Sequence, residues 1–430
     1  MVDFVGAILI TNKRGKSRKA ILAVSLITNL GLLGFFKYFN FFLDNISEVF
    51  SFCGVPLQME ALTVVLPVGI SFYTFQTMSY TIDVYRGHLK PTHDFVAFSA
   101  YVSFFPQLVA GPIERATNLL PQFQKPRQFD MTLAVDGLRQ ILWGLFKKVV
   151  IADNCATIVN AIFDQSDQYS GPILIMGAAF FAIQIYCDFS GYSDMALGLS
   201  RLFGFSMMQN FAFPYFSRDI AEFWRRWHIS LSTWFRDYLY IPLGGSRGNK
   251  WMKIRNTFAI FLVSGFWHGA NWTFIFWGLL HALFFLPLLL ADKNRVNLEI
   301  VRTNRLFFPS ITDTIRIAST FALTCIAWIF FRAENIQHAL QYVSDMILGM
   351  LNRQAYIDGL NFSFWELNHT ICALTLMMIA AEWVGKNGQH ALEHLENRLS
   401  MPARWLAYLI LTGFIVYYFG SEQQFIYFQF

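Results

Sequence analysis

The sequence predicts an all-α protein that crosses a membrane several times. Hydrophobic residues make up 55% of the 430 residues and charged residues only 14%, against about 25% charged residues in soluble globular proteins. Aromatic residues reach 18%. So few charges cannot keep that much apolar surface out of water. The composition therefore excludes a cytosolic enzyme, a disordered chain and a collagen-like fibre.

A series of long apolar runs supports this fold class. A helix needs about 20 apolar residues to cross a bilayer. Several of the runs are interrupted by Pro or Gly, and broken backbone inside a bilayer is tolerated only where protein or a water-filled cavity surrounds it. We therefore expect broken or re-entrant helices and an irregular core. The runs are 20–43, 62–80, 95–110, 138–163, 172–202, 257–290, 317–331, 369–384 and 403–419.

The first residues depart from this pattern. A short apolar stretch, 2–10, is followed at once by NKRGKSRK, which holds five Lys or Arg. The order is the reverse of a signal peptide, in which charge precedes the apolar region. The stretch is too short to cross a bilayer alone. We expect either the end of a helix whose beginning is missing or a segment that dips into the interface.

Positive charge is concentrated in the middle of the chain. Residues 201–255 hold nine Lys or Arg and three acidic residues, a balance of +6 that exceeds the +5 of the whole chain. The positive-inside rule predicts that this segment and the basic cluster at 13–19 face the cytoplasm. No repeat or linker divides the sequence, so we expect a single integral-membrane domain over 1–430.

Within the basic segment, residues 219–238 predict an amphipathic helix that lies in the membrane interface. On a wheel of 100° per residue, seven large apolar side chains share an arc of about 120°, opposite a face rich in arginine. The helix is either a simple surface anchor or part of a site, because His228 lies at the edge of the aromatic arc. The seven residues are Phe223, Trp224, Trp227, Leu231, Trp234, Phe235 and Tyr238.

His268, in the string SGFWHGANWTFIFWG, is the first candidate catalytic residue. An ionisable side chain in an apolar run is costly at membrane depth, which favours a functional role. Imidazole is suited to taking a proton from a hydroxyl near neutral pH. The alternative is a core histidine satisfied by a backbone carbonyl or by Asn271. His281 would point about 220° away on an unbroken helix, so we expect it outside this site.

A third cluster, QIYCDFSGYSDMALGLSRLFG, combines polar residues with an apolar run. Asp188 and Tyr192 share one helical face, as do Ser190 and Asp194. These groups either line a polar tunnel or hold helices together. Two carboxylates so close would also suit a proton path in a transporter.

Five long strings resemble the membrane-bound O-acyltransferase (MBOAT) family, in particular its bacterial AlgI- and PatA-like branch of alginate and peptidoglycan O-acetyltransferases. The resemblance runs from about Ala20 to the terminal FIYFQF. In this family the invariant histidine lies in the WHG string, here His268, and a second, more variable histidine or asparagine corresponds to His228. The strings are SFFPQLVAGPIER, WGLFKKVVIADN, CDFSGYSDMALGLSRLFGF, FPYFSRDIAEFWRRWHISLSTWFRDYLYIPLGGSR and FWHGANWTFIFWGLLHAL.

The resemblance implies further hydrophobic helices before Ala20, so we expect that this chain lacks the first helices of the family. It also implies a multi-pass protein of the bacterial inner membrane that moves an acetyl group from cytoplasmic acetyl-CoA, through a tunnel, to an extracytoplasmic polysaccharide. An SGNH-type transferase is the implied partner. We expect no permanent cofactor, no metal site and no nucleic-acid partner.

In this interpretation His268 is the general base, and His228 orients the donor or stabilises the oxyanion. No Gly-rich phosphate loop is present, so the CoA phosphates would bind Arg225, Arg226, Arg236 and Arg247. Asp188, Tyr192, Asp194 and Asn271 are candidate tunnel residues. Two alternatives stay open: D-alanyl transfer to teichoic acid, as in the related DltB branch, and a polysaccharide transporter or flippase.

Overall fold

The computed structural model describes residues 1–55, 61–303, 308–365, 367–420 and 423–426. Within these ranges the chain has no β-strand, and helices follow one another with short connections. Four helical segments among these described residues are long and apolar enough to cross a membrane. The all-α, multi-pass membrane fold expected from the sequence is thereby confirmed. The four segments are Lys16–Phe52, Pro172–Leu202, Trp272–Leu290 and Ile311–Arg332.

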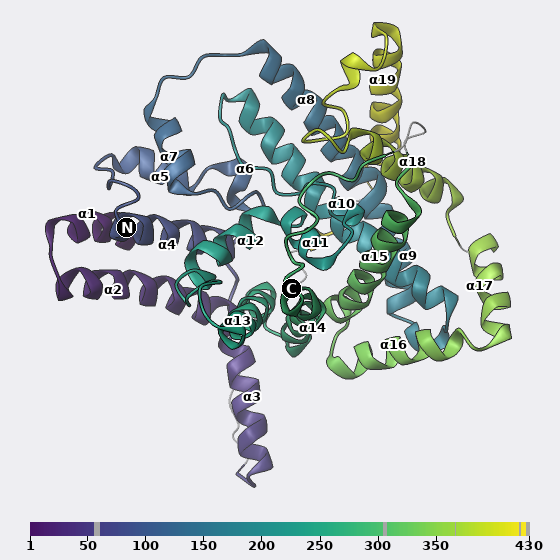
Figure 1. Ribbon diagram of the computed structural model, residues 1–430, viewed down its shortest axis with the longest axis horizontal. Helices are drawn as coiled ribbons and strands as arrows, with labels where there is room; N and C mark the ends of the chain where they lie inside the picture. The colour runs from purple at the N-terminus through teal and green to yellow at the C-terminus, as the bar shows by residue number, and fades with distance from the viewer. Residues whose placement is uncertain (56–60, 304–307, 366, 421–422, 427–430) are drawn as a thin grey trace.

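The described residues of the first half of the chain form ten α-helices, two π-helical segments and one 3-10 turn (Figure 1). They are α1 (Val2–Asn12), α2 (Lys16–Leu33), η1 (Gly34–Tyr38), α3 (Phe39–Phe52), α4 (Ile70–Arg86), α5 (Phe95–Val102), α6 (Phe105–Leu108), α7 (Ala116–Gln124), α8 (Met131–Leu145), η2 (Phe146–Ala152), α9 (Asp153–Phe163), η3 (Ser166–Gln168) and α10 (Pro172–Leu202).

In the second half, the part of the chain that the structure describes forms nine α-helices, two 3-10 turns and a third π-helical segment. They are η4 (Pro214–Phe216), α11 (Ile220–Arg226), α12 (Ile229–Phe235), η5 (Arg236–Tyr240), α13 (Lys250–His268), α14 (Trp272–Leu290), α15 (Ile311–Arg332), α16 (Ile336–Gly349), α17 (Arg353–Trp365), α18 (His369–Gly385), η6 (Leu395–Asn397) and α19 (Met401–Tyr418).

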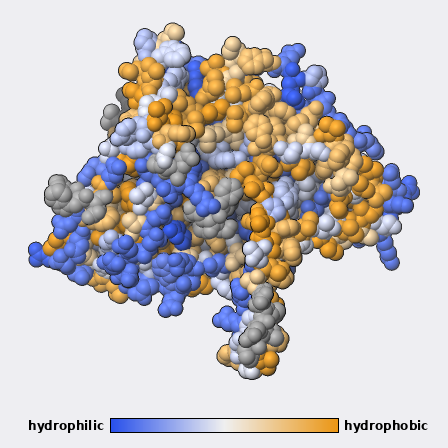
Figure 2. Space-filling view, turned by 180° about the vertical axis from the view of Figure 1, so that it is seen from behind, coloured by the Kyte–Doolittle hydropathy of each residue, from blue (hydrophilic) through white to orange (hydrophobic). Residues whose placement is uncertain are grey.

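The long helix α10 runs through the centre of the molecule (Figure 1). It packs against α8, η2 and α9 on the amino-terminal side of the sequence and against α15 and α16 on the carboxyl-terminal side. Most of its side chains are buried. A helix that is apolar on all sides is stable where other helices surround it. The surface seen from behind has broad hydrophobic areas, as expected of a protein in a lipid bilayer (Figure 2).

The short apolar stretch at the amino terminus forms α1, which packs against α2 and α4. Its Asp3 is buried, and the carboxylate accepts hydrogen bonds from Ser25 Oγ at 2.6 Å, Asn29 Nδ2 at 2.9 Å and Thr81 Oγ1 at 3.0 Å. Three donors offset the cost of burying this carboxylate. α1 is therefore docked onto the helices that follow it.

One arm stands away from the rest of the molecule. α3 continues α2 through the π-helical segment η1 and projects outward (Figure 1). None of the residues of α3 is buried. About halfway along α3, Asn45 Oδ1 accepts a hydrogen bond at 2.8 Å from Nε1 of Trp272 at the start of α14. The arm is thus tied to the end of the α13–α14 hairpin.

Candidate active site

His268 is the last residue of α13, and it is 5% exposed. The chain becomes extended directly after it, so the last carbonyl groups of the helix need other partners. Lys37 Nζ in η1 donates to the carbonyl oxygens of His268 at 2.7 Å and Trp267 at 3.0 Å, and the Tyr38 hydroxyl donates to that of Phe266 at 2.9 Å. A cation at this end also complements the helix dipole. η1 therefore fixes the end of α13 that carries His268.

Two glycines let α13 and α14 approach each other closely. A Cβ atom on Gly265 would lie 2.2 Å from the carbonyl oxygen of Phe274, and one on Gly278 would lie 2.3 Å from that of Phe261. Real Cβ contacts are essentially never shorter than 3.0 Å. Small residues commonly permit such close packing between membrane helices. The two glycines thus allow the His268 end of α13 to pack closely against α14.

Aromatic rings enclose the imidazole of His268. The ring centroids of Trp267, Trp277 and Phe331 lie 5.0, 5.1 and 5.4 Å from its centroid. Trp267 also lies 6.2 Å from the ring of His228. One indole therefore contacts both imidazoles, and the structure brings the two candidate catalytic histidines into one aromatic enclosure.

The tautomer of His228 follows from its neighbours. Its Nδ1 lies 3.1 Å from Asn210 Oδ1, and the backbone N–H of Ser230 donates to the same oxygen at 3.3 Å. Because that atom is an acceptor, Nδ1 of His228 carries the proton. Burial lowers the pKa of His228 to about 3, so the ring is neutral at pH 7 and Nε2 holds a lone pair. Orienting a donor substrate fits this tautomer, whereas donating to an oxyanion from Nε2 does not.

His228 also interrupts the helix expected over 219–238. Its φ is 42°, a left-handed value that costs roughly 1–2 kcal/mol for a residue with a Cβ. The backbone N–H of Ile229 donates to the carbonyl oxygen of Asn210 at 2.9 Å instead of continuing the helical ladder. The segment is therefore divided at His228 into α11 and a second helix, α12, which continues directly into the π-helical η5. Its large aromatic face is buried in protein, through Phe223, Trp227, Leu231, Trp234 and Phe235.

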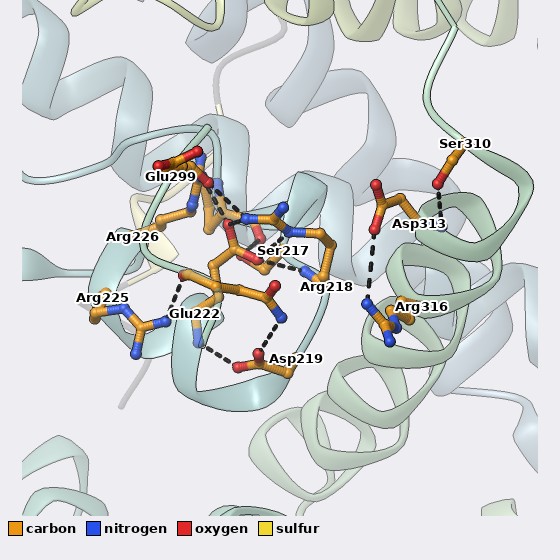
Figure 3. Close-up of polar contacts among 12 residues, drawn as sticks. Ser217, Arg218, Asp219, Glu222, Arg225, Arg226, Glu299, Ser310, Asp313 and Arg316 are labelled. Atoms are coloured by element: carbon orange, nitrogen blue, oxygen red, sulfur yellow. Dashed lines mark hydrogen bonds and ion pairs between the residues drawn. The ribbon is translucent and has the colours of Figure 1, made fainter. Parts of the chain in front are cut away.

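Two of the four predicted phosphate-binding arginines hold the protein together (Figure 3). Arg225 donates to the carbonyl oxygens of Asn294 at 2.9 Å and Asn297 at 2.8 Å. Arg226 donates to the fully buried carboxylate of Glu222 at 2.7 Å. These contacts fix α11 and the segment after α14, so both guanidinium groups already have partners.

A cavity of about 220 Å³ lies beside α13 and contains the third predicted arginine, Arg236. The Arg236 side chain is 59% exposed and pairs with Asp237 at 2.8 Å. Arg295 lines the same cavity and was missed by the sequence analysis, since no local motif marks it. Arg247 is exposed nearby in the sequence but does not line this cavity. The inner wall is largely apolar, and the hydroxyl groups of Thr257 and Ser264 lie among the side chains of Trp224, Leu231, Ile260 and Phe261. We call this space the donor cavity.

A second cavity of about 260 Å³ lies at the carboxyl end of α13. It is lined by Trp267, at that end of the helix, and by Lys37, which donates to the carbonyl oxygen of Trp267. Phe72 lines it as well, and its ring lies 6.5 Å from that of His228. The remaining wall comes from the segment before α4, from Val109 and from Gln424. We call this space the acceptor cavity.

The predicted tunnel residues have other contacts. Asp194 forms an ion pair with Lys147 at 2.7 Å, and Asp188 forms one with Lys148 at 2.8 Å. Among the residues that the structure describes, neither carboxylate lines the donor or acceptor cavity. Tyr192 is half-buried, 5.5 Å from the ring of Phe425. These three side chains therefore pack α10 against its neighbours.

Asn271 begins α14 as its amino-terminal cap. Its Oδ1 accepts from the backbone N–H of Thr273 at 3.0 Å, and its Nδ2 donates to the carbonyl oxygen of Glu334 at 2.9 Å. Such caps satisfy backbone groups that the helix leaves without partners. The side chain of Asn271 is thus used to start the helix after the turn at His268.

His281 lies closer to His268 than expected. The apolar run 257–290 is broken between α13 and α14, and α14 folds back along α13. The angle computed for one unbroken helix therefore does not apply. The ring of Trp277 lies 4.8 Å from His281 and 5.1 Å from His268, so a single indole separates the two imidazoles.

The sequence of the chain matches known proteins over most of its length. The sequence model of the membrane-bound O-acyltransferase family covers residues 86–332. The probable alginate O-acetylase AlgI of Pseudomonas aeruginosa is 40% identical over 84% of this chain and 67% of its own length. The AlgI of Azotobacter vinelandii is 41% identical over 77% of this chain and 64% of its own length. The chain thus spans about two thirds of these relatives.

A peptidoglycan O-acetyltransferase of Helicobacter pylori is 35% identical over 95% of this chain and 82% of its own length. A teichoic acid D-alanyltransferase of Bacillus subtilis is more distant, at 30% identity over 63% of this chain and 70% of its own length. Both catalytic candidates, His228 and His268, lie within the matched residues 86–332. The multi-pass helical fold and these matches together show that the chain is an enzyme of the membrane-bound O-acyltransferase family, related most nearly among these proteins to O-acetyltransferases.

Proposed function

We propose that the protein transfers an acetyl group from cytoplasmic acetyl-CoA, through the membrane, for O-acetylation of an extracytoplasmic polysaccharide. The acceptor is alginate-like, peptidoglycan or another exopolysaccharide, and an extracytoplasmic SGNH-type transferase completes the transfer. The protein acts in the bacterial inner membrane. Its relatives named for alginate and peptidoglycan O-acetylation support this class of reaction.

The proposal rests on two cavities along α13, one beside its middle turns and one at its carboxyl end, next to His268. The donor cavity follows α13 from Thr257 to Ser264, one turn before His268. The acceptor cavity is lined by Trp267, directly beside His268. The donor cavity opens among the basic residues that the positive-inside rule assigns to the cytoplasm. This arrangement supports a donor that enters from one side and an acceptor that enters from the other.

Arg236 and Arg295 at the donor cavity suit the phosphates of a CoA thioester, because guanidinium groups pair with phosphate in a bidentate manner. The narrow, largely apolar inner wall suits the pantetheine arm. His268 takes the proton of the acceptor hydroxyl, and the hydroxyl oxygen attacks the thioester carbon. The C–S bond then breaks, and the thiolate of CoA receives that proton from His268. His228 accepts a hydrogen bond at Nε2 and orients the substrate beside Trp267.

The test uses the full chain in sealed vesicles, with acetyl-CoA labelled in the acetyl group and a panel of alginate oligosaccharides and peptidoglycan fragments. Wild-type protein is expected to leave label on an acceptor on the opposite side, with and without an SGNH-type partner compared. His268→Ala is expected to lower the rate by about 10²–10⁴-fold, the usual contribution of a general base. Near-normal turnover by an inserted, folded His268→Ala protein would contradict the assignment of His268 as the general base.

The same vesicles separate the alternatives. A D-alanyltransferase of the teichoic acid type, for which the Bacillus subtilis relative is named, would use an aminoacyl thioester on a carrier protein rather than free acetyl-CoA. A transporter would move its substrate unmodified and leave no acetyl label on it. Either result would contradict the proposed acetyl transfer.

A further inference from the structure

Two buried N–H groups lie on the face of α14 that runs from the donor cavity to His268. Trp277 and His281 are one helical turn apart, and both are 0% exposed. Neither Nε1 of Trp277 nor Nε2 of His281 has a hydrogen-bond partner among the residues that the structure describes. Buried polar groups of this kind cost free energy unless something pairs with them.

The contact with Trp224 determines which nitrogen of His281 carries the proton. Trp224 Nε1 lies 3.2 Å from His281 Nδ1, and an indole nitrogen can only donate. Nδ1 of His281 is therefore the acceptor. An imidazolium without an anionic partner is too costly to bury among aromatic rings, so the ring is neutral and its proton is on Nε2. Both nitrogens without partners, on Trp277 and on His281, are consequently hydrogen-bond donors.

These donors lie between the donor cavity and the general base. Trp224 and Phe261 line the donor cavity, and their rings lie 4.9 and 6.2 Å from that of His281. His281 in turn contacts Trp277 at 4.8 Å, and Trp277 contacts His268 at 5.1 Å. An acyl group that extended from the donor cavity toward His268 would therefore meet this row of rings.

We propose that Trp277 Nε1–H and His281 Nε2–H bind the carbonyl oxygen of the acyl thioester and stabilise the oxyanion that forms on it; this assignment rests on the proposed acyl transfer. When the acceptor oxygen attacks, the carbonyl π electrons move onto this oxygen, and the two donors compensate the new charge without giving up their protons. When the C–S bond breaks, the carbonyl reforms. His228 cannot take this role as a neutral ring, because its Nε2 holds a lone pair.

The first test replaces Trp277 by Phe, which keeps an aromatic ring and removes the N–H. Loss of one donor to an oxyanion lowers kcat by about 10²–10³-fold, and the KM for acetyl-CoA is expected to stay within about threefold because the bond forms in the transition state. Trp143→Phe is the matched control, since Trp143 is a buried indole away from His268. The control is expected to keep its kcat.

The second test compares two replacements of His281. In His281→Asn the amide oxygen can still accept from Trp224, but no donor remains at the position of Nε2. In His281→Gln the longer amide places an N–H donor there. Asn is expected to lower kcat as strongly as Trp277→Phe, whereas Gln is expected to keep at least a tenth of the wild-type kcat because it supplies a donor.

Equal losses in the Asn and Gln variants, or a Trp277→Phe protein with wild-type kcat, would overturn the assignment while leaving wild-type acetyl transfer intact. A wild-type protein that transfers no acetyl label in the same vesicles would instead refute the proposed function itself. Thermal unfolding of each variant in detergent shows whether it is folded. If both Trp277→Phe and His281→Asn unfold, the His281→Gln variant by itself tests whether position 281 acts as a donor. A folded Gln variant with less than a tenth of the wild-type kcat contradicts that role.

Discussion

Replacing Gly278 by Ala tests whether the close approach of α13 and α14 positions His268, the proposed general base. The new Cβ would lie 2.3 Å from the carbonyl oxygen of Phe261, whereas ordinary contacts begin at 3.4 Å. The helices must therefore separate locally by about 1.1 Å, the difference between these two distances. The obstacle is backbone, so no side-chain rotation can relieve it.

His268 lies two turns beyond Phe261 on the same rigid helix and moves with it. A misplacement of about 1 Å at a reacting group can lower the rate about 10²-fold, and overpacking costs about 1–3 kcal/mol of stability. We therefore expect a Gly278→Ala protein that inserts and folds but has a kcat reduced by about two orders of magnitude. Steady-state transfer of labelled acetyl groups in vesicles measures kcat, and thermal unfolding in detergent measures the loss of stability.

Gly413→Ala is the matched control. Gly413 also lies inside an apolar helix, α19, but a Cβ there would meet no atom within 4 Å. Because Ala has the higher helix propensity, the control is expected to keep its activity and to be no less stable. A Gly278→Ala protein with wild-type kcat would show that the spacing of α13 and α14 does not set the position of His268.

Three further perturbations follow from the same contacts. Arg295→Ala is expected to raise the KM for acetyl-CoA, and in the wild type this KM is expected to rise with ionic strength because exposed charges are screened; a KM independent of salt would argue against phosphate contacts. Lys37→Met removes the cation from the carboxyl end of α13 and is expected to lower kcat; unchanged kinetics would show that η1 does not position His268. Glu222→Ala leaves Arg218 and Arg226 without their shared carboxylate and is expected to lower the free energy of unfolding by about 3–5 kcal/mol. Denaturant titration measures this loss, and a loss below about 1 kcal/mol would contradict the role of Glu222 in a buried ion pair.

Local sequence patterns indicated the candidate residues of the site, but they did not predict how these residues are arranged in space. His228 and His268 stand out because imidazoles in aromatic, apolar surroundings are unusual, and the structure places them around Trp267. The break at His228 was not predictable, because it depends on Asn210, which lies outside the helix and binds both the ring and the backbone after it. A wheel assumes an unbroken helix and cannot register such a contact.

The arginines show the same limit. Their number predicted an anion-binding surface, but which of them have partners depends on segments distant in the sequence. The carbonyl groups that hold Arg225 come from residues after α14, and Arg295 reaches the donor cavity from the same segment. The role of His281 was obscured for a related reason, since uniform hydrophobicity hides the turn at Gly269–Asn271 that folds α14 back on α13.

The π-helical segment Gly34–Tyr38 contains one residue more than an ordinary α-helical turn. The position of its side chains therefore depends on the number of residues in this segment as well as on their identity. Deleting one residue would let an ordinary helix run on into the projecting arm, and would rotate one side of the joint by about 100° relative to the other. Lys37 and Tyr38 could then no longer both reach the end of α13. The deletion would make the helix regular but would remove the hydrogen bonds that hold the His268 end of α13.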